Sequence, residues 1–186
     1  MPKRAATIVV VPLAVVLLAV AAPALAGPPP ESLLDRPLVR HGLHFQVAFG
    51  IGGGPKSGGL LHSMELGYSF GQRGYTLAYD HVFLLSDGFA PIAGGSDMFG
   101  GHLLVFKTPI FRNELVAKVA AGLGESVNLH GGFTPYFGFG WLYGLDLNIP
   151  VTRTSGFTLG VISFHAVTSD VGHQWAAGSY LAYTWF

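Results

Sequence analysis

A short segment late in the chain, "SFHAVTSD", combines the residue types of nucleophilic catalysis. It runs from Ser163 to Asp170 and includes His165 and Ser169. A serine hydroxyl becomes a nucleophile when a histidine takes its proton and a third group orients that histidine. In this hypothesis His165 acts as the base, with Ser163 or Ser169 as the nucleophile. Asp170 would be the orienting group, provided that the fold brings these side chains together.

A second set of polar residues is expected to share one face of a sheet. If Gln72 and Arg73 form the tip of a hairpin, Glu65 lies directly opposite Asp80. Like charges in that position repel each other unless a cation lies nearby. We therefore predict an inward polar cluster made of His44, Gln46, Glu65, Asp80, His102 and Lys118. It would stabilise the interior by hydrogen bonding, and the alternatives are a bound metal ion or a proton path.

Two further patterns indicate a function less specifically than these two groups. The segment "GIGGGPKSG" resembles a phosphate-binding loop, but Pro55 stands before Lys56 where that loop needs glycine, and no helical pattern follows. It is predicted to be a loop between strands. His62 and His81 are expected on the outward face near the loop end, among aromatic residues, with a lipid phosphate or a metal as the alternative contact.

The elements that position these residues are expected to be strands, because large apolar residues alternate with small or polar ones. In the first segment Leu43, Phe45 and Val47 alternate with His44 and Gln46. Eight segments follow this pattern: 43–51, 60–70, 75–85, 98–108, 114–123, 133–148, 156–166 and 174–186. Strands of this length cross a bilayer when tilted.

Charges and connections support a membrane barrel. Glu65, Asp80, Lys118 and Asp146 all fall on the face opposite the large apolar side chains, as expected if that face lines a lumen. The connections around 71–74, 109–113 and 149–155 are shorter on average than those around 52–59, 86–97, 124–132 and 167–173. We therefore predict an all-β fold, an eight-stranded antiparallel transmembrane barrel over residues 41–186.

The N-terminal residues predict export. Lys3 and Arg4 precede an apolar run, and Ala24-Leu25-Ala26 is a small-residue cleavage site, so residues 1–26 are predicted to be a cleaved signal peptide. A retained membrane anchor is the alternative. Residues 27–40 are predicted to be a proline-rich periplasmic leader. The chain has no cysteine, which excludes disulfides, and its balanced charge gives no indication of nucleic-acid binding.

The chain resembles the small eight-stranded outer-membrane barrels of Gram-negative bacteria, of the OmpA transmembrane or opacity-protein type. Those families end in a strand of alternating apolar and aromatic residues with a terminal Phe, similar to the end of this chain. The resemblance implies an assembly signal at Tyr180, Tyr183, Trp185 and Phe186, although Phe186 is out of phase with Tyr183 and Trp185. It implies barrel-assembly machinery, outer-membrane lipid and lipopolysaccharide as partners.

Outer-membrane lipid A deacylases are barrels of similar size that carry a His-x-Ser-Asn motif and a late Glu. Here His165 is followed by Ala166 and Val167, and residues 174–186 contain no acid. We therefore expect a non-catalytic barrel with a structural, surface-interaction or narrow-pore role and no cofactor. The alternatives are a lipid A-modifying hydrolase and a small ion or solute channel. Loop acids are expected at Asp87, Asp97, Glu125 and Asp170, and the sequence leaves the oligomeric state open.

Overall fold

The computed structural model describes residues 40–54, 58–71, 73–86, 97–111, 114–128, 134–169 and 172–186. The predicted signal peptide, 1–26, and the predicted leader up to residue 39 lie outside the described residues, as do Lys56, Gln72, Asp87 and Asp170. Within the described part of the chain, no helix is long and apolar enough to cross a membrane.

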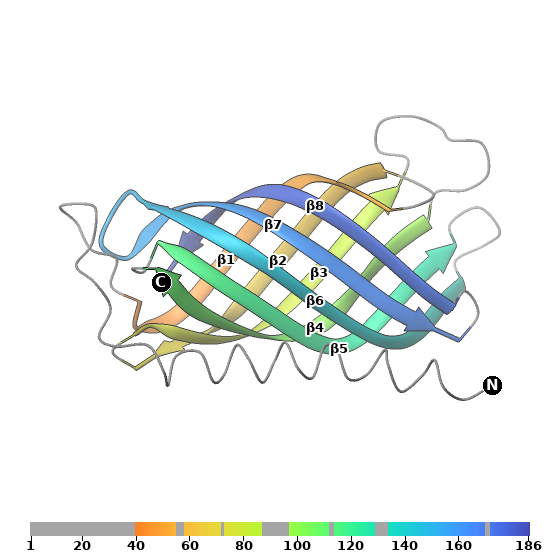
Figure 1. The fold of residues 1–186 in the computed structure, drawn as a ribbon, viewed down its shortest axis with the longest axis horizontal. Coiled ribbons are helices and arrows are strands. Elements are labelled where there is room, and N and C mark those ends of the chain that lie inside the picture. Colours follow the sequence, from red (N-terminus) through yellow and green to blue (C-terminus); the bar gives the residue numbers. More distant parts are fainter. Residues whose placement is uncertain are drawn as a thin grey trace.

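Eight antiparallel strands form one closed barrel, which confirms the predicted fold class (Figure 1). The strands are β1 (Gly42–Gly53), β2 (Gly58–Phe70), β3 (Tyr75–Ser86), β4 (Asp97–Phe111), β5 (Leu115–Asn128), β6 (Thr134–Pro150), β7 (Ser155–Thr168) and β8 (Gly172–Trp185). Each pairs with its neighbours in the chain, and β1 pairs with β8, from Phe45 opposite Trp185 to Gly53 opposite Ala177. The backbone groups at both edges of the sheet are therefore paired.

The barrel has two distinct ends. At the turn end β2 ends and β3 begins, β4 ends and β5 begins, β6 ends and β7 begins, and β8 runs into the C-terminus. At the loop end β1 ends and β2 begins, β3 ends and β4 begins, β5 ends and β6 begins, and β7 ends and β8 begins (Figure 1). At the turn end Gly71 and Gly74 adopt positive φ, and the Gly74 amide donates to the Gly71 carbonyl at 3.1 Å. Glycine meets this need without strain.

The alternation of the sequence sets the two faces of the wall. In β1, Leu43 is 77% exposed on the outer face, whereas His44 and Gln46 are fully buried in the lumen. β4 differs because both of its faces are apolar at mid-strand: Leu103 points inward and Leu104 outward. The sequence of β4 consequently does not indicate clearly which of its faces points into the lumen.

Candidate functional site

The turn-side half of the lumen is filled by a network of charged side chains from four strands. Lys107 of β4 lies 2.5 Å from Glu65 Oε2 of β2 and 3.0 Å from Asp146 Oδ2 of β6. Lys118 of β5 lies 3.2 Å from Glu65 Oε1 and 3.8 Å from Asp146 Oδ1. Each lysine thus contacts both carboxylates, and two positive charges balance two negative ones. We call these four residues, with their hydrogen-bond partners, the lumen network.

Three neutral side chains add hydrogen bonds and a close polar contact to this network. Tyr180 of β8 accepts a hydrogen bond from Lys118 Nζ at 2.6 Å and donates one to Asp146. Gln46 accepts one from Lys107 at 2.9 Å, and His44 Nε2 lies 3.3 Å from Glu65 Oε2. His44 Nδ1 and Gln46 Nε2 have no hydrogen-bond partner among the described residues, so these two polar atoms are buried at a cost to stability.

Tyr180 has room in the lumen because the residue opposite it has no side chain. Gly160 of β7 pairs with Tyr180, and a Cβ atom on Gly160 would lie 2.1 Å from the Cζ atom of the tyrosine ring. Tyr180 was expected to act with the other C-terminal aromatic residues as an assembly signal. Its side chain points inward as part of the lumen network, while Tyr183 and Trp185 lie on the outer face. The assembly signal itself stays a prediction.

The predicted pairing of Glu65 with Asp80 is present in the register between β2 and β3. Asp80 Oδ1 accepts a hydrogen bond from Ser63 at 2.8 Å, and Asp80 Oδ2 has no hydrogen-bond partner among the described residues. The structure therefore brings His44, Gln46, Glu65, Asp80 and Lys118 into the lumen together.

The sixth predicted member, His102, was placed wrongly. It points outward from β4 and lies opposite His81 of β3. The same error hid Lys107, since a β4 strand that puts Lys107 inside also puts Leu103 inside and His102 outside. A signal for the correct face was present in the sequence, because a lysine near the middle of a lipid-facing wall is costly.

The loop-side half of the lumen is apolar. We call the side chains that fill it the apolar plug: Leu61, Val82, Leu84, Phe99, Leu103, Ile162, Phe164 and Ala176. Phe99 and Phe164 pack with their ring centroids 4.8 Å apart. The void left among the plug side chains is about 10 Å³, at the lower limit of the space that one water molecule needs.

The residues proposed for catalysis form a separate group on the outer face of β6, β7 and β8. Ser163 Oγ lies 2.9 Å from His165 Nε2, and His165 Nδ1 lies 3.3 Å from His173 Nε2. The Tyr143 hydroxyl lies 3.3 Å from His165 Nε2, and Trp141 stacks on His165 at an interplanar angle of 6°. We call these five residues the Ser163 cluster.

The contacts link Ser163 to His165 and His165 to His173, which is the arrangement of a nucleophile, a base and an orienting group. Sequence reasoning missed His173, because only the pairing of β7 with β8 brings it beside His165. Ser169 is exposed at the end of β7, and Asp170, the predicted orienting residue, lies outside the described residues. A proton could pass from Ser163 to His165, which is the first requirement for acyl transfer.

Two further predictions are altered at the ends of the wall. Glu125, expected in a loop, lies within β5, where its side chain is 9% exposed, and Asp97 begins β4. Phe186 packs inside the turn end, with its ring centroid 6.0 Å from that of His44 and the Arg40 guanidinium 4.8 Å above it. Phe186 is out of phase with Trp185 in the sequence because Phe186 points into the barrel and Trp185 points outward.

Comparison with solved structures identifies the same architecture elsewhere. The chain is similar to Neisserial surface protein A, with a TM-score of 0.57 and 13% identity over 79% of this chain and 97% of that one. The fold is that of the small eight-stranded outer-membrane barrels. Other matches to this barrel are the N-terminal β-barrel domain of Pseudomonas aeruginosa OprF (TM-score 0.43, 15% identity, covering 78% and 98%) and the outer membrane enzyme PagL (0.41, 15%, 77% and 99%). No protein-family model matches the chain, and no curated protein matches it.

Proposed function

We propose that this protein is a closed, non-conducting barrel of the Gram-negative outer membrane. It would be exported by residues 1–26, anchored by its wall, and used to present its loop end to partners outside the cell. The observation that carries the proposal is the filled lumen. The lumen network occupies the turn-side half and the apolar plug occupies the loop-side half, where a void lined by plug residues measures about 10 Å³.

The outer face supports a lipid environment. Its exposed large side chains are mostly apolar, and many aromatic residues lie toward the two ends, as in a membrane barrel. At the turn end these are Phe45, Phe70, Tyr75, Phe157, Tyr183 and Trp185, and at the loop end Phe83, Phe137, Phe139, Trp141 and Trp175. Outer-membrane lipid and lipopolysaccharide are accordingly the proposed partners of this surface, and barrel-assembly machinery that of the C-terminal strand.

Single-channel recording tests the proposal directly. The purified protein, shown to be folded by a heat-dependent shift on an electrophoresis gel, is inserted into planar bilayers. We expect no steady conductance steps, because buried side chains of the described residues occupy both halves of the lumen. A matched sample of heat-unfolded protein controls for leakage caused by insertion alone. Reproducible steps from the folded sample, absent from this control, would overturn the proposal in favour of a channel.

A second function is favoured by one observation, the 2.9 Å contact between Ser163 Oγ and His165 Nε2. It lies on the lipid-facing side of the wall, where a serine nucleophile would meet the ester bonds of membrane lipids. The Tyr143 hydroxyl on the same face could donate a hydrogen bond to a developing oxyanion. The proposed reaction is hydrolysis of an acyl ester of lipid A.

Mass spectra of lipid A from cells that express the protein test the proposed hydrolysis. Loss of one acyl chain is expected if the Ser163 cluster is catalytic, and the loss should disappear in Ser163→Ala and in His165→Ala. Gly58→Ala, at the loop end and outside the cluster, serves as the matched control. An unchanged spectrum, with the protein folded in the outer membrane, would exclude the hydrolase and leave the non-catalytic barrel.

A further inference from the structure

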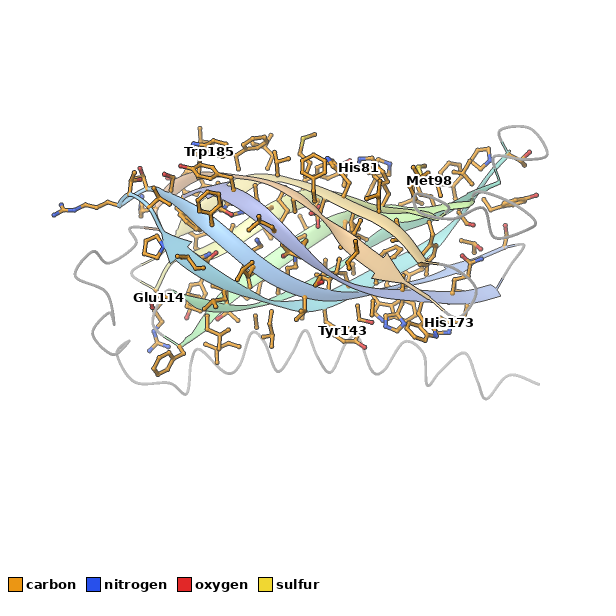
Figure 2. All side chains as sticks on the ribbon, turned by 90° about the horizontal axis from the view of Figure 1, so that it is seen from above. His81, Met98, Glu114, Tyr143, His173 and Trp185 are labelled. Carbon is orange, nitrogen blue, oxygen red and sulfur yellow. The ribbon has the colours of Figure 1, made fainter. Side chains whose placement is uncertain are left out.

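Three side chains from adjacent strands converge on the outer face of the loop-side half. His81 of β3 and His102 of β4 lie opposite each other, and their rings stack with centroids 4.6 Å apart at an angle of 10°. Glu125 of β5 reaches toward both: its Oε1 is 3.7 Å from His81 Nε2 and its Oε2 is 3.8 Å from His102 Nε2. We call these three residues the His81 cluster. In Figure 2, His81 lies on the side of the barrel opposite Tyr143 and His173 of the Ser163 cluster.

The position of Glu125 is unusual for a charge in this wall. Glu65, Asp80, Lys107, Lys118 and Asp146 point into the lumen, whereas Glu125 points outward yet is only 9% exposed. In the sheet, Gly100 of β4 lies between Glu125 and Phe83 of β3. A carboxylate shielded from water on an outer wall is costly unless a cation compensates it.

We propose that the His81 cluster binds a divalent transition metal ion of the zinc class. One candidate ligand atom from each of the three residues lies within 4.8 Å of the other two. Zinc–ligand bonds of about 2.0–2.1 Å place tetrahedral ligands about 3.3–3.4 Å apart. The 3.7 and 3.8 Å separations from Glu125 need to shorten by a few tenths of an ångström. A separation at the 4.8 Å limit of the group would have to shorten by about 1.4 Å, which requires rotation of the side chains on binding.

The donor set selects this class of ion. Two imidazoles and one carboxylate suit zinc and its neighbours, whereas calcium and magnesium prefer oxygen ligands throughout. The carboxylate also disfavours the opposite hypothesis, in which two protonated histidines hold a lipid phosphate by themselves. Three protein ligands leave a fourth position of a tetrahedral site for water or an outside oxygen ligand.

An outer contact orients one of the ligands. Tyr79 of β3 hydrogen-bonds His102 Nδ1, which leaves Nε2 to face Glu125. Metal-binding histidines commonly hold their second ring nitrogen in this way, and loss of such a partner lowers metal affinity about 10–100-fold. The contact of His102 Nδ1 is therefore the one expected at a metal site. The bound ion would join β3, β4 and β5 on the outside of the wall.

The test is zinc binding by the tag-free folded protein in detergent, measured by competition with a chromophoric chelator and by metal content after dialysis. We expect one tightly bound zinc, lost in His102→Ala and in Glu125→Gln, and bound more weakly by about 10–100-fold in Tyr79→Phe. His173→Ala removes a histidine from the other outer-face group and should retain the zinc. X-ray absorption at the zinc edge should show two imidazole nitrogens and a carboxylate oxygen.

Glu125→Gln keeps the size of the side chain, so a folding defect is not expected to obscure the result, and the gel shift verifies folding for each variant. Absence of stoichiometric zinc binding by the folded wild-type protein would overturn the proposal. Binding unaffected by both His102→Ala and Glu125→Gln would overturn it as well, and loss of the zinc in His173→Ala alone would move the site to the Ser163 cluster.

Discussion

The two halves of the lumen are filled in different ways. Toward the turn end, Lys107, Lys118, Glu65 and Asp146 satisfy one another through directed contacts of 2.5–3.8 Å. Toward the loop end, the apolar plug fills the lumen with side chains that make no directed contacts, and it encloses a void of about 10 Å³. Both halves close the barrel, yet one depends on particular partners and the other on total volume.

This difference predicts different tolerance to substitution. Removing one member of a buried charged network leaves its partners uncompensated in a medium of low dielectric constant. Exchanging one apolar residue for another of similar volume leaves no such partner, so the cost is limited to local repacking. Changes of equal size should thus be much more destabilising in the lumen network than in the apolar plug.

The largest effect is expected for Lys107→Met, which keeps the length of the side chain and removes its charge. Glu65 loses its 2.5 Å contact and Asp146 its 3.0 Å contact, and the free energy of unfolding should fall by about 3–5 kcal/mol. Urea unfolding in lipid vesicles measures this change. Adding Glu65→Gln to Lys107→Met should recover part of the lost stability, because one negative charge is then removed together with the positive one. The control is Arg153→Met on the surface, which should change the free energy of unfolding by less than about 0.5 kcal/mol. A Lys107→Met protein as stable as Arg153→Met would contradict the comparison.

A smaller loss is expected for Gly160→Ala, which changes the space available to the lumen network and not its charge. The new Cβ atom would overlap the Tyr180 ring and displace the hydroxyl from Asp146 and Lys118. Overpacking of this kind costs about 1–3 kcal/mol, measured by the same urea titration. Gly58→Ala is the control, since its Cβ would lie 3.4 Å from the nearest atom, the Gly52 carbonyl oxygen. Equal stability of the two variants would show that Tyr180 is not held in place.

The smallest effect is expected for Leu103→Met in the apolar plug. Leu103 is fully buried, but the substitution conserves volume and leaves no polar partner behind, so the loss should stay below about 1.5 kcal/mol. Comparison with Lys107→Met on the same strand makes the test specific, since both replacements introduce methionine. If Leu103→Met were the more destabilising of the two, packing and not charge pairing would limit the stability of this barrel.

The strand pattern was predictable from sequence wherever one face was apolar and the other was small or polar. In β1, β2 and β3 this alternation predicted the faces, and the proposed hairpin tip at Gln72 and Arg73 predicted that Glu65 lies opposite Asp80. It failed in β4, where Leu103, Leu104 and Val105 are consecutive and apolar on both faces, so His102 was assigned inward and Lys107 was overlooked.

The candidate catalytic group was predictable only in part. Ser163 and His165 share a face because they are two residues apart on one strand, a relation that the sequence shows directly. His173 joins them through the pairing of β7 with β8, and the register across that hairpin was not specified by the segment itself. The orienting residue was therefore sought at Asp170.

The sequence by itself determined an eight-stranded barrel, the outward face of most strands and the inward direction of Glu65, Asp80, Lys118 and Asp146. Only the tertiary structure decided that Lys107 and Lys118 meet Glu65 and Asp146 across the lumen, and that Glu125 meets His81 and His102 over Gly100. The physical reason is that alternation is a local property of each strand. Contacts across a lumen or between several strands depend instead on the stagger and tilt with which the whole sheet closes.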